Sequence, residues 1–235
     1  MKPVLILQHL STDGPAYLAT WLRTHAVPFE VFDTQAGQSY PDHLDGYGAL
    51  AVLGGEMSAN DTMPSLRQAE RLIVEGMRDG VPVIGHCLGG QLMARALGAS
   101  VHASPAPEIG WQPMRIEPGD AAHAWFGALS EATVFHWHFE AFALPPGAVR
   151  LASSAACPHQ AFAIGPHLGM QFHVELDADK LARWSASTDP TYLRLQNECT
   201  SVQPGALMRA QAATALEAQQ ALAARLYARW IGAAR

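Results

Sequence analysis

Cys87 has the sequence surroundings that best suit chemistry, because it lies in the run Gly-His-Cys-Leu-Gly-Gly-Gln. Residues 81–84 predict a short buried strand, and residues 88–97 predict a helix. The cysteine would then stand at a strand-to-helix corner, where Gly85 and Gly89 avoid clashes that a Cβ would cause. The start of a helix also favours a thiolate over a thiol. The pattern predicts a nucleophile, although a free cysteine is most commonly a buried, inert side chain.

A thiol nucleophile needs a general base, and the base needs a group that orients it. His173 is the candidate among eleven histidines, because it lies near the end of an expected strand, residues 168–174, and Glu175 follows two positions later. Alternate side chains of a strand share a face, so both residues would point from its carboxyl end. Ligands of open α/β folds bind at that end of the sheet. We therefore expect a triad with Cys87. Without the cysteine, an incidental histidine near a surface glutamate would be the better interpretation.

Two glycines, Gly54 and Gly55, end an apolar segment, residues 49–53, that predicts another buried strand. A glycine pair at this place lets backbone N–H groups point into the same cleft. Acyl transfer needs two such donors for the oxyanion of the tetrahedral intermediate. The N–H groups of Gly55 and of Leu88, the residue after the nucleophile, are the expected pair. An ordinary turn at the end of a strand is the alternative.

Strands and helices alternate through the amino-terminal part of the sequence. The expected strands are residues 4–8, 29–32, 49–53 and 81–84, and the expected helices end near residues 25, 78 and 97. This alternation predicts an α/β fold, with an open, mostly parallel sheet and helices on both faces.

The pattern changes after Val101, where strand-like segments follow one another without long helices. These segments are residues 108–116, 133–138, 149–152, 161–164 and 168–174. They either extend the sheet or form a small antiparallel β layer. The tail, residues 206–233, has Leu222, Leu226 and Trp230 on one helical stripe, which predicts a helix covering the sheet. A partner-binding helix is the alternative. We expect a single domain over residues 1–235.

Composition and charge narrow the classes of function. Of the 235 residues, 49% are hydrophobic and 15% are charged, which is typical of a globular protein. The net charge of −6 gives no reason to expect a nucleic acid or an anionic membrane as partner. No apolar run approaches the roughly 18 residues of a membrane span. Three widely spaced cysteines without a CxxC pair argue against a disulfide framework and a zinc site. We expect no metal, no cofactor and a cytoplasmic location, where thiols stay reduced.

The run around Cys87, the upstream Gly-Gly loop and the late His173-Val174-Glu175 together resemble the class I (triad) glutamine amidotransferase family, whose fold is flavodoxin-like. The resemblance covers about residues 40–180. The subgroup that it indicates is the stand-alone proteins similar to the glutaminase domain of GMP synthase. The resemblance implies that Cys87 attacks the side-chain amide of glutamine, and that His173 and Glu175 complete the triad.

The resemblance also implies a substrate pocket that contains Gln91, Met57 and His138. For His138, a packed or surface histidine is the alternative. Two positions depart from the family's pattern. Val174 replaces the usual proline, with little expected loss because a β-branched residue also favours an extended chain. Glu56 stands where proline usually follows the glycine pair, and a carboxylate there could alter which γ-glutamyl substrate is accepted.

The implied function is hydrolysis of the glutamine side-chain amide through a glutamyl thioester. The same machinery could cleave γ-glutamyl peptides or conjugates, and a non-catalytic metabolite-binding or regulatory subunit is a third hypothesis. Such amidotransferases deliver ammonia to a synthetase domain, but the chain contains no G-x-x-x-x-G-K-[ST] loop and no Ser-Gly-Gly pyrophosphate loop. We expect at most the hydrolytic half-reaction here. Glutamine or another γ-glutamyl small molecule would be the substrate, and a separate synthetase or acceptor protein is a possible partner.

Overall fold

The amino-terminal part of the protein alternates strands with helices, as its sequence predicts. The computed structural model describes residues 2–234. The elements of this part are β1 (Val4–Gln8), α1 (Ala16–Thr24), β2 (Phe29–Asp33), β3 (Ala49–Val52), α2 (Pro64–Asp79), β4 (Val83–His86) and α3 (Leu88–Ala96). Every strand and helix expected here is present, and the ends differ by a few residues.

The strands of the described chain form one nine-stranded sheet in the order β2-β1-β3-β4-β9-β8-β7-β5-β6. The later strands are β5 (Val101–Ile116), β6 (Glu131–Phe142), β7 (Val149–Ser153), β8 (Ala161–Ile164) and β9 (His167–Met170). Neighbours from β2 to β9 pair in parallel, and neighbours from β9 to β6 pair antiparallel. The predicted α/β class is confirmed. The late strands extend the sheet, so the small antiparallel layer expected in addition to it is not a separate layer in the described residues. The sheet is mixed and not mostly parallel, because four of its strand pairings are parallel and four are antiparallel.

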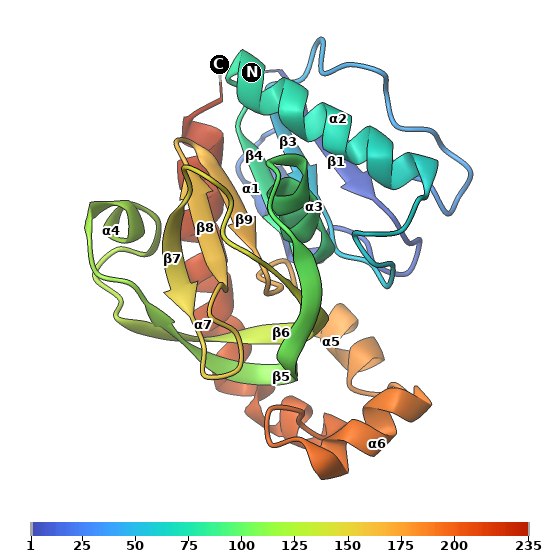
Figure 1. The fold of residues 1–235 in the computed structure, drawn as a ribbon, viewed down its shortest axis with the longest axis vertical. Helices are drawn as coiled ribbons and strands as arrows, with labels where there is room; N and C mark the ends of the chain where they lie inside the picture. The colour runs from blue at the N-terminus through green and yellow to red at the C-terminus, as the bar shows by residue number, and fades with distance from the viewer. Residues whose placement is uncertain (1, 235) are drawn as a thin grey trace.

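Helices cover both faces of the parallel strands (Figure 1). Val4 and Ile6 of β1 pack in one hydrophobic core with residues of α1 and of the last helix, α7 (Gly205–Gly232). Leu5 and Leu7 pack in a second core with residues of α2 and α3. Because alternate side chains of a strand point to opposite faces, a strand buried on both sides is apolar throughout.

Helix α7 is the covering helix that the tail predicts, and it lies against the sheet in Figure 1. Leu222, Leu226 and Trp230 are buried in the first core. Trp230 Nε1 donates a hydrogen bond to the carbonyl of Pro82 at 3.0 Å. Pro82 precedes β4, so the helix is tied to the strand that leads to Cys87. Among residues 2–234, neither this helix nor any other combines the length and apolar character needed to cross a membrane.

Three short helices are present that were not predicted from the sequence. They are α4 (Asp120–Phe126), α5 (Ala178–Trp184) and α6 (Pro190–Glu198). The last two begin at Asp177 and Asp189, whose side chains each accept a hydrogen bond from the N–H three residues later. A third hydrophobic cluster holds α5 and α6 against β5 and β6, at the lower end of the molecule in Figure 1. The two aspartates are a local signal that could have located both helices.

Candidate functional site

Cys87 occupies a strained corner between β4 and α3. Its φ of 48° and ψ of −107° lie outside the regions that non-glycine residues normally adopt. A Cβ on Gly85 would come within 2.6 Å of the backbone of Gly89, and a Cβ on Gly89 would collide with the carbonyl of Val52. The two glycines therefore allow the close approach of helix and sheet that the corner requires, as the sequence predicts.

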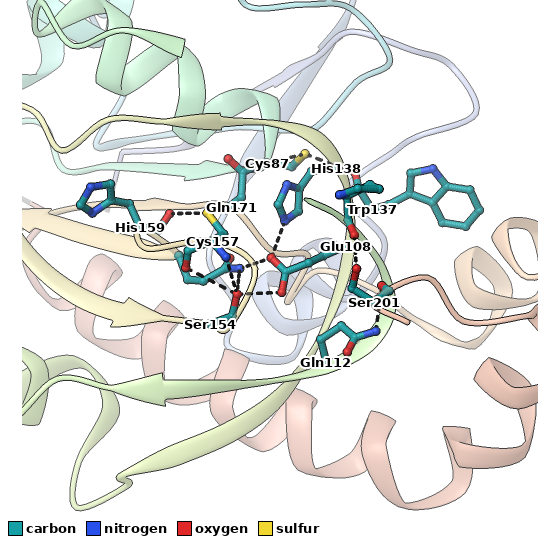
Figure 2. A network of polar contacts seen from close by, with 12 residues as sticks. Cys87, Glu108, Gln112, Trp137, His138, Ser154, Cys157, His159, Gln171 and Ser201 are labelled. Carbon is teal, nitrogen blue, oxygen red and sulfur yellow. Dashed lines mark hydrogen bonds and ion pairs between the residues drawn. The ribbon is translucent and has the colours of Figure 1, made fainter. Parts of the chain in front are cut away.

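The sulfur of Cys87 is nearly buried and meets two polar groups. The side-chain amide of Gln171 donates to the Cys87 Sγ at 3.6 Å, and the carbonyl of Trp137 lies 3.7 Å from the same sulfur. Figure 2 shows both contacts as dashed lines. Gln171 follows β9, and Trp137 belongs to β6, so the sulfur is framed by strands distant in the sequence.

His173 and Glu175 form a buried pair beside this corner. His173 Nδ1 lies 2.7 Å from Glu175 Oε1, and both side chains are almost inaccessible to solvent. Burial lowers the pKa of His173, but the negative charges of Glu175 and Cys87 raise it by more, to about 10. Burial raises the pKa of Glu175, but His173 and the cation of Lys180 hold it far below its usual range. The pair is therefore imidazolium and carboxylate at neutral pH.

The strand expected over residues 168–174 is shorter, because β9 ends at Met170. After it the chain turns, and its hydrogen bonds go to other elements. The N–H of His173 donates to the carbonyl of Phe135 in β6, and the carbonyl of Glu175 accepts from the N–H of Tyr17 in α1. The pairing of histidine and glutamate in this structure therefore arises in a turn held by β6 and α1, and the explanation from strand alternation is wrong.

The glycine pair after β3 lies against the same residues. A Cβ on Gly54 would come within 2.9 Å of His173 Cε1. A Cβ on Gly55 would come within 2.9 Å of Leu88 Cδ2 and 3.1 Å of Met57 Sδ. The structure thus places Gly55 against Leu88, the residue after Cys87, and Gly55 and Cys87 line the same cavity. It also shows that Gly54 leaves the space that His173 occupies.

A cavity of about 670 Å³ opens over the sulfur. The predicted site residues that line it are Gly55, Met57, Cys87, Gln91, His138 and His173. Leu88 and Glu175 lie just behind this surface, in contact with Gly55 and His173 respectively. The structure therefore gathers the predicted site residues around one cleft at the carboxyl ends of the parallel strands.

Gln91 is held at the wall of this cavity by its own side chain. Its Nε2 donates to the carbonyl of Glu140 at 3.0 Å and to Gln171 Oε1 at 3.4 Å. Since the Gln171 amide also contacts Cys87, one hydrogen-bonded row joins β6, α3 and the nucleophile corner. Gln171 and Glu140 are site residues that the sequence analysis missed.

His138 lines the cavity and is also packed in a buried polar cluster (Figure 2). Its Nε2 lies 3.1 Å from Glu108 Oε2, and its Nδ1 lies 3.1 Å from the carbonyl of Glu140. Each ring nitrogen of His138 therefore has a hydrogen-bonding partner. Glu108 additionally accepts from Ser154 at 2.7 Å and from Gln160 at 2.5 Å. His138 is therefore both a residue of the cavity wall and a packed histidine, which were the two alternatives for it.

Glu108, His136 and His138 are a group in residues 2–234 whose ligand atoms lie within 4.8 Å of one another. The carboxylate of Glu108 is already engaged by Ser154, Gln160 and His138. Burial lowers the pKa of His136 to about 3, more than the charge of Glu108 raises it, so this ring is neutral. The arrangement suits a closed hydrogen-bonded cluster better than a metal centre. The expectation of no metal stays a prediction.

The outer wall of the cavity comes from the glycine loop and from the region of α5 and α6, two helices that were not predicted from the sequence. Trp184 of α5 lies edge-on to His173, with ring centroids 4.8 Å apart. Glu56, Arg183 and Asp189 also line the cavity, and all three are exposed. The glycine loop and the segments of α5 and α6 therefore give this wall charges of both signs.

Known proteins resemble this chain in sequence and in fold. The family model described as glutamine amidotransferase class-I matches residues 17–181. The glutamine amidotransferase-like protein YfeJ of Salmonella typhimurium is 32% identical over 180 residues, covering 73% of this chain and 74% of that protein. One subunit of the glutamine-hydrolysing GMP synthase of Thermoplasma acidophilum is 30% identical over 143 residues, covering 60% of this chain and 69% of that relative. A crystal structure of a glutamine amidotransferase from Methylobacillus flagellatus has 33% identity and a TM-score of 0.91, covering 100% of this chain and 96% of that one. The chain therefore belongs to the class-I glutamine amidotransferase family.

Proposed function

We propose that this protein hydrolyses the γ-amide bond of glutamine or of another γ-glutamyl compound, with Cys87 as the nucleophile. The observation that carries the proposal is the buried His173–Glu175 pair, 2.7 Å between Nδ1 and Oε1, beside the strained cysteine corner. Because Nδ1 is bound to Glu175, Nε2 is the nitrogen left to exchange protons with the sulfur and the substrate.

In the first half-reaction, the Cys87 thiolate attacks the carbonyl carbon of the γ-amide. The N–H groups of Gly55 and Leu88 bind the oxyanion of the tetrahedral intermediate. The carbon–nitrogen bond then breaks, and the Nε2 proton of His173 goes to the leaving nitrogen. Ammonia or an amine departs, and a glutamyl thioester remains on the enzyme.

In the second half-reaction, the now neutral His173 takes a proton from a water molecule. The resulting hydroxide attacks the thioester carbonyl, and the carbon–sulfur bond breaks. Glutamate is released, and the thiolate and the imidazolium are restored. Glu175 stays ionised throughout and stabilises the imidazolium form of His173.

Glutamine is the simplest substrate, and γ-glutamyl peptides or conjugates are the second candidate. The charges of Glu56, Arg183 and Asp189 suit the α-ammonium and α-carboxylate groups that both substrates carry, and the observation in favour of the second is the room in a cavity of about 670 Å³. We also propose that the ammonia from glutamine serves a separate synthetase. Support comes from the Thermoplasma acidophilum relative, whose name describes one component of a GMP synthase. The expected compartment is the cytoplasm, where the free cysteines stay reduced.

The test is an activity screen of the whole purified chain with glutamine and a set of γ-glutamyl dipeptides. Ammonia, glutamate and free amino acids are measured, with Cys87→Ser as the inactive comparison. Cys199→Ser is the matched control, because this cysteine lies outside the cavity. Ammonia from glutamine supports the amidase, and an amino acid released from a dipeptide supports the peptidase.

A glutamine-like diazoketone distinguishes an enzyme from a non-catalytic subunit. We expect it to modify Cys87 in the unaltered chain, because the reagent places an electrophilic carbon where the γ-amide would lie. Failure of both the screen and this labelling would contradict the proposed activity and support a metabolite-binding or regulatory role.

A further inference from the structure

Helix α5 carries a lysine into the interior of the protein. Lys180 is one of two lysines in the chain, and its side chain is 1% exposed. A buried ammonium group is costly unless opposite charges surround it. Lys180 Nζ lies 2.5 Å from Asp13 Oδ1 and 3.4 Å from Glu175 Oε1. The lysine thus joins the loop after β1 to the proposed triad.

The same carboxylate oxygen of Glu175 binds two cations. Oε1 accepts from His173 Nδ1 and from Lys180 Nζ. The charge of Glu175 also acts on His86 of β4 and on Tyr227 of α7, whose Nε2 and hydroxyl lie 3.2 Å apart. Burial lowers the pKa of His86 and raises that of Tyr227, so both groups are neutral near pH 7. Lys180 is therefore the permanent positive charge that Glu175 keeps while the histidine gains and loses its proton.

One turn further along α5, Trp184 contacts His173, the partner of Glu175. Its ring stands at 88° to the ring of His173, and Lys180 Nζ lies 5.3 Å from its centroid. Residues four apart share one face of a helix. The helix thus presents one side chain to the carboxylate of Glu175 and another to the imidazole of His173.

We propose that Lys180, anchored by Asp13, is a positioning residue that keeps Glu175 ionised and aligned with His173. The inference rests on the proposed roles of Cys87 and His173. Burial lowers the pKa of Lys180, but Asp13 and Glu175 raise it by more, which supports a permanent cation. The lysine does not line the cavity, so it acts on the substrate only through the pair.

Neutralising Lys180 should raise the pKa of Glu175, because an adjacent opposite charge shifts a carboxyl group by about 1–3 units. Once Glu175 binds a proton, it no longer stabilises the imidazolium that balances the Cys87 thiolate. Other groups also face the histidine ring, namely the sulfur of Cys87 and the neutral ring of His136. Neither of these would replace the lost cation.

The experiment measures the rate of Cys87 alkylation by iodoacetamide against pH, in the full chain, by mass spectrometry. As the pH is lowered, the alkylation rate of Cys87 falls. In Lys180→Met we expect this fall to occur at a pH higher by about one unit or more. Lys2→Met is the matched control, because it makes the same change at the other, exposed lysine. Its profile should coincide with that of the unaltered chain. For turnover, kcat should fall in Lys180→Met while KM changes little.

Removing one partner of a buried ion pair is strongly destabilising, so Lys180→Gln is the second variant. Glutamine keeps N–H donors but has no charge, and it should give the same shift. Lys180→Arg restores the charge, so the pH at which the alkylation rate falls should return toward that of the unaltered chain. A folded Lys180→Gln or Lys180→Met protein with an unchanged profile would overturn the proposal, even if kcat fell, because a merely structural role would leave the profile in place.

The alkylation profile does not depend on any substrate. If the unaltered chain turned over no γ-glutamyl compound, the proposed function would fail, and the profile would still show whether Lys180 controls the pair. If turnover occurred and the profile of the variants did not move, only the role of Lys180 would be lost.

Discussion

Cys87 differs from the other two cysteines in its surroundings at the scale of single residues. It lines the cavity at a helix N-terminus, beside a protonated histidine. Cys157 is buried, which raises the pKa of its thiol to about 11. Cys199 lies outside the cavity. Brief iodoacetamide treatment near neutral pH should therefore modify Cys87 first, as mass spectrometry of digested protein can show. Faster modification of Cys157 or Cys199 would argue against the nucleophile.

Substitutions of His173 and Glu175 separate proton transfer from orientation. We expect His173→Ala to lower kcat/KM by about 10²–10⁴-fold, the usual contribution of a general acid–base group. Glu175→Gln should cost less, because an amide oxygen still accepts from Nδ1 but does not stabilise the imidazolium. Because each change breaks a buried ion pair, circular dichroism should first establish that both variants are folded. Activity equal to that of the unaltered chain in both would remove the triad.

At the scale of elements, the loop after β3 and the start of α3 meet at Gly55. A Cβ there would press on the ends of two flexible side chains, Leu88 and Met57, and would meet His9 Cβ at an ordinary contact distance of 3.4 Å. We therefore expect Gly55→Val to change the thermal midpoint little. It should lower kcat by about 10²-fold or more, as loss of an oxyanion donor does. The added methyl groups also narrow the cavity, so KM and kcat must be measured separately.

Gly89, at the same junction, provides the contrast for this measurement. Its Cβ would collide with the backbone carbonyl of Val52, which cannot move without shifting β3. Gly89→Ala should therefore destabilise the fold by about 1–3 kcal/mol, the usual cost of overpacking. Gly232→Ala is the control, because no atom lies near its Cβ position. A Gly55→Val protein that unfolds, or one that keeps full activity, would identify the glycine loop as an ordinary turn.

For the whole molecule, buried histidines should determine how stability depends on pH. Burial lowers the pKa of His9 to about 4 and of His136 to about 3, more than Asp13 and Glu108 raise them. An unfolded histidine titrates near pH 6.5, so between about pH 6.5 and 4 the unfolded chain binds more protons than the folded one. The free energy of unfolding should then fall with decreasing pH, by up to about 1.4 kcal/mol per pH unit for each histidine.

The His173–Glu175 pair should make the free energy of unfolding fall with increasing pH, at higher pH values. The pKa of His173 is raised to about 10 in the folded protein. This shift stabilises the folded state fully below about pH 6.5, and the stabilisation is lost as the pH rises toward 10. The thermal midpoint measured by calorimetry should therefore be highest near pH 6.5–7. His136→Gln should flatten the acid side, whereas His123→Gln, at an exposed position, should not. A midpoint constant between pH 4.5 and 6.5 would contradict this account.

The sequence alone determined the features that depend on neighbouring residues. The apolar runs of β1, β3 and β4 are short and bounded by turns, so they predicted buried strands. The glycines around Cys87 predicted the corner, because the steric requirement there is local. The Ala- and Leu-rich tail predicted α7 by its helical stripe.

Only the tertiary structure decided which distant residues meet. Parallel pairing of β4 with β9 places His173 beside Cys87, and contacts from β6 and α1 shape the turn that pairs it with Glu175. The insertion of Lys180 between Asp13 and Glu175, and the engagement of His138 with Glu108, were not predicted. An isolated charged residue in a sequence is normally an exposed one, since burial of a charge depends on a partner brought close by the fold.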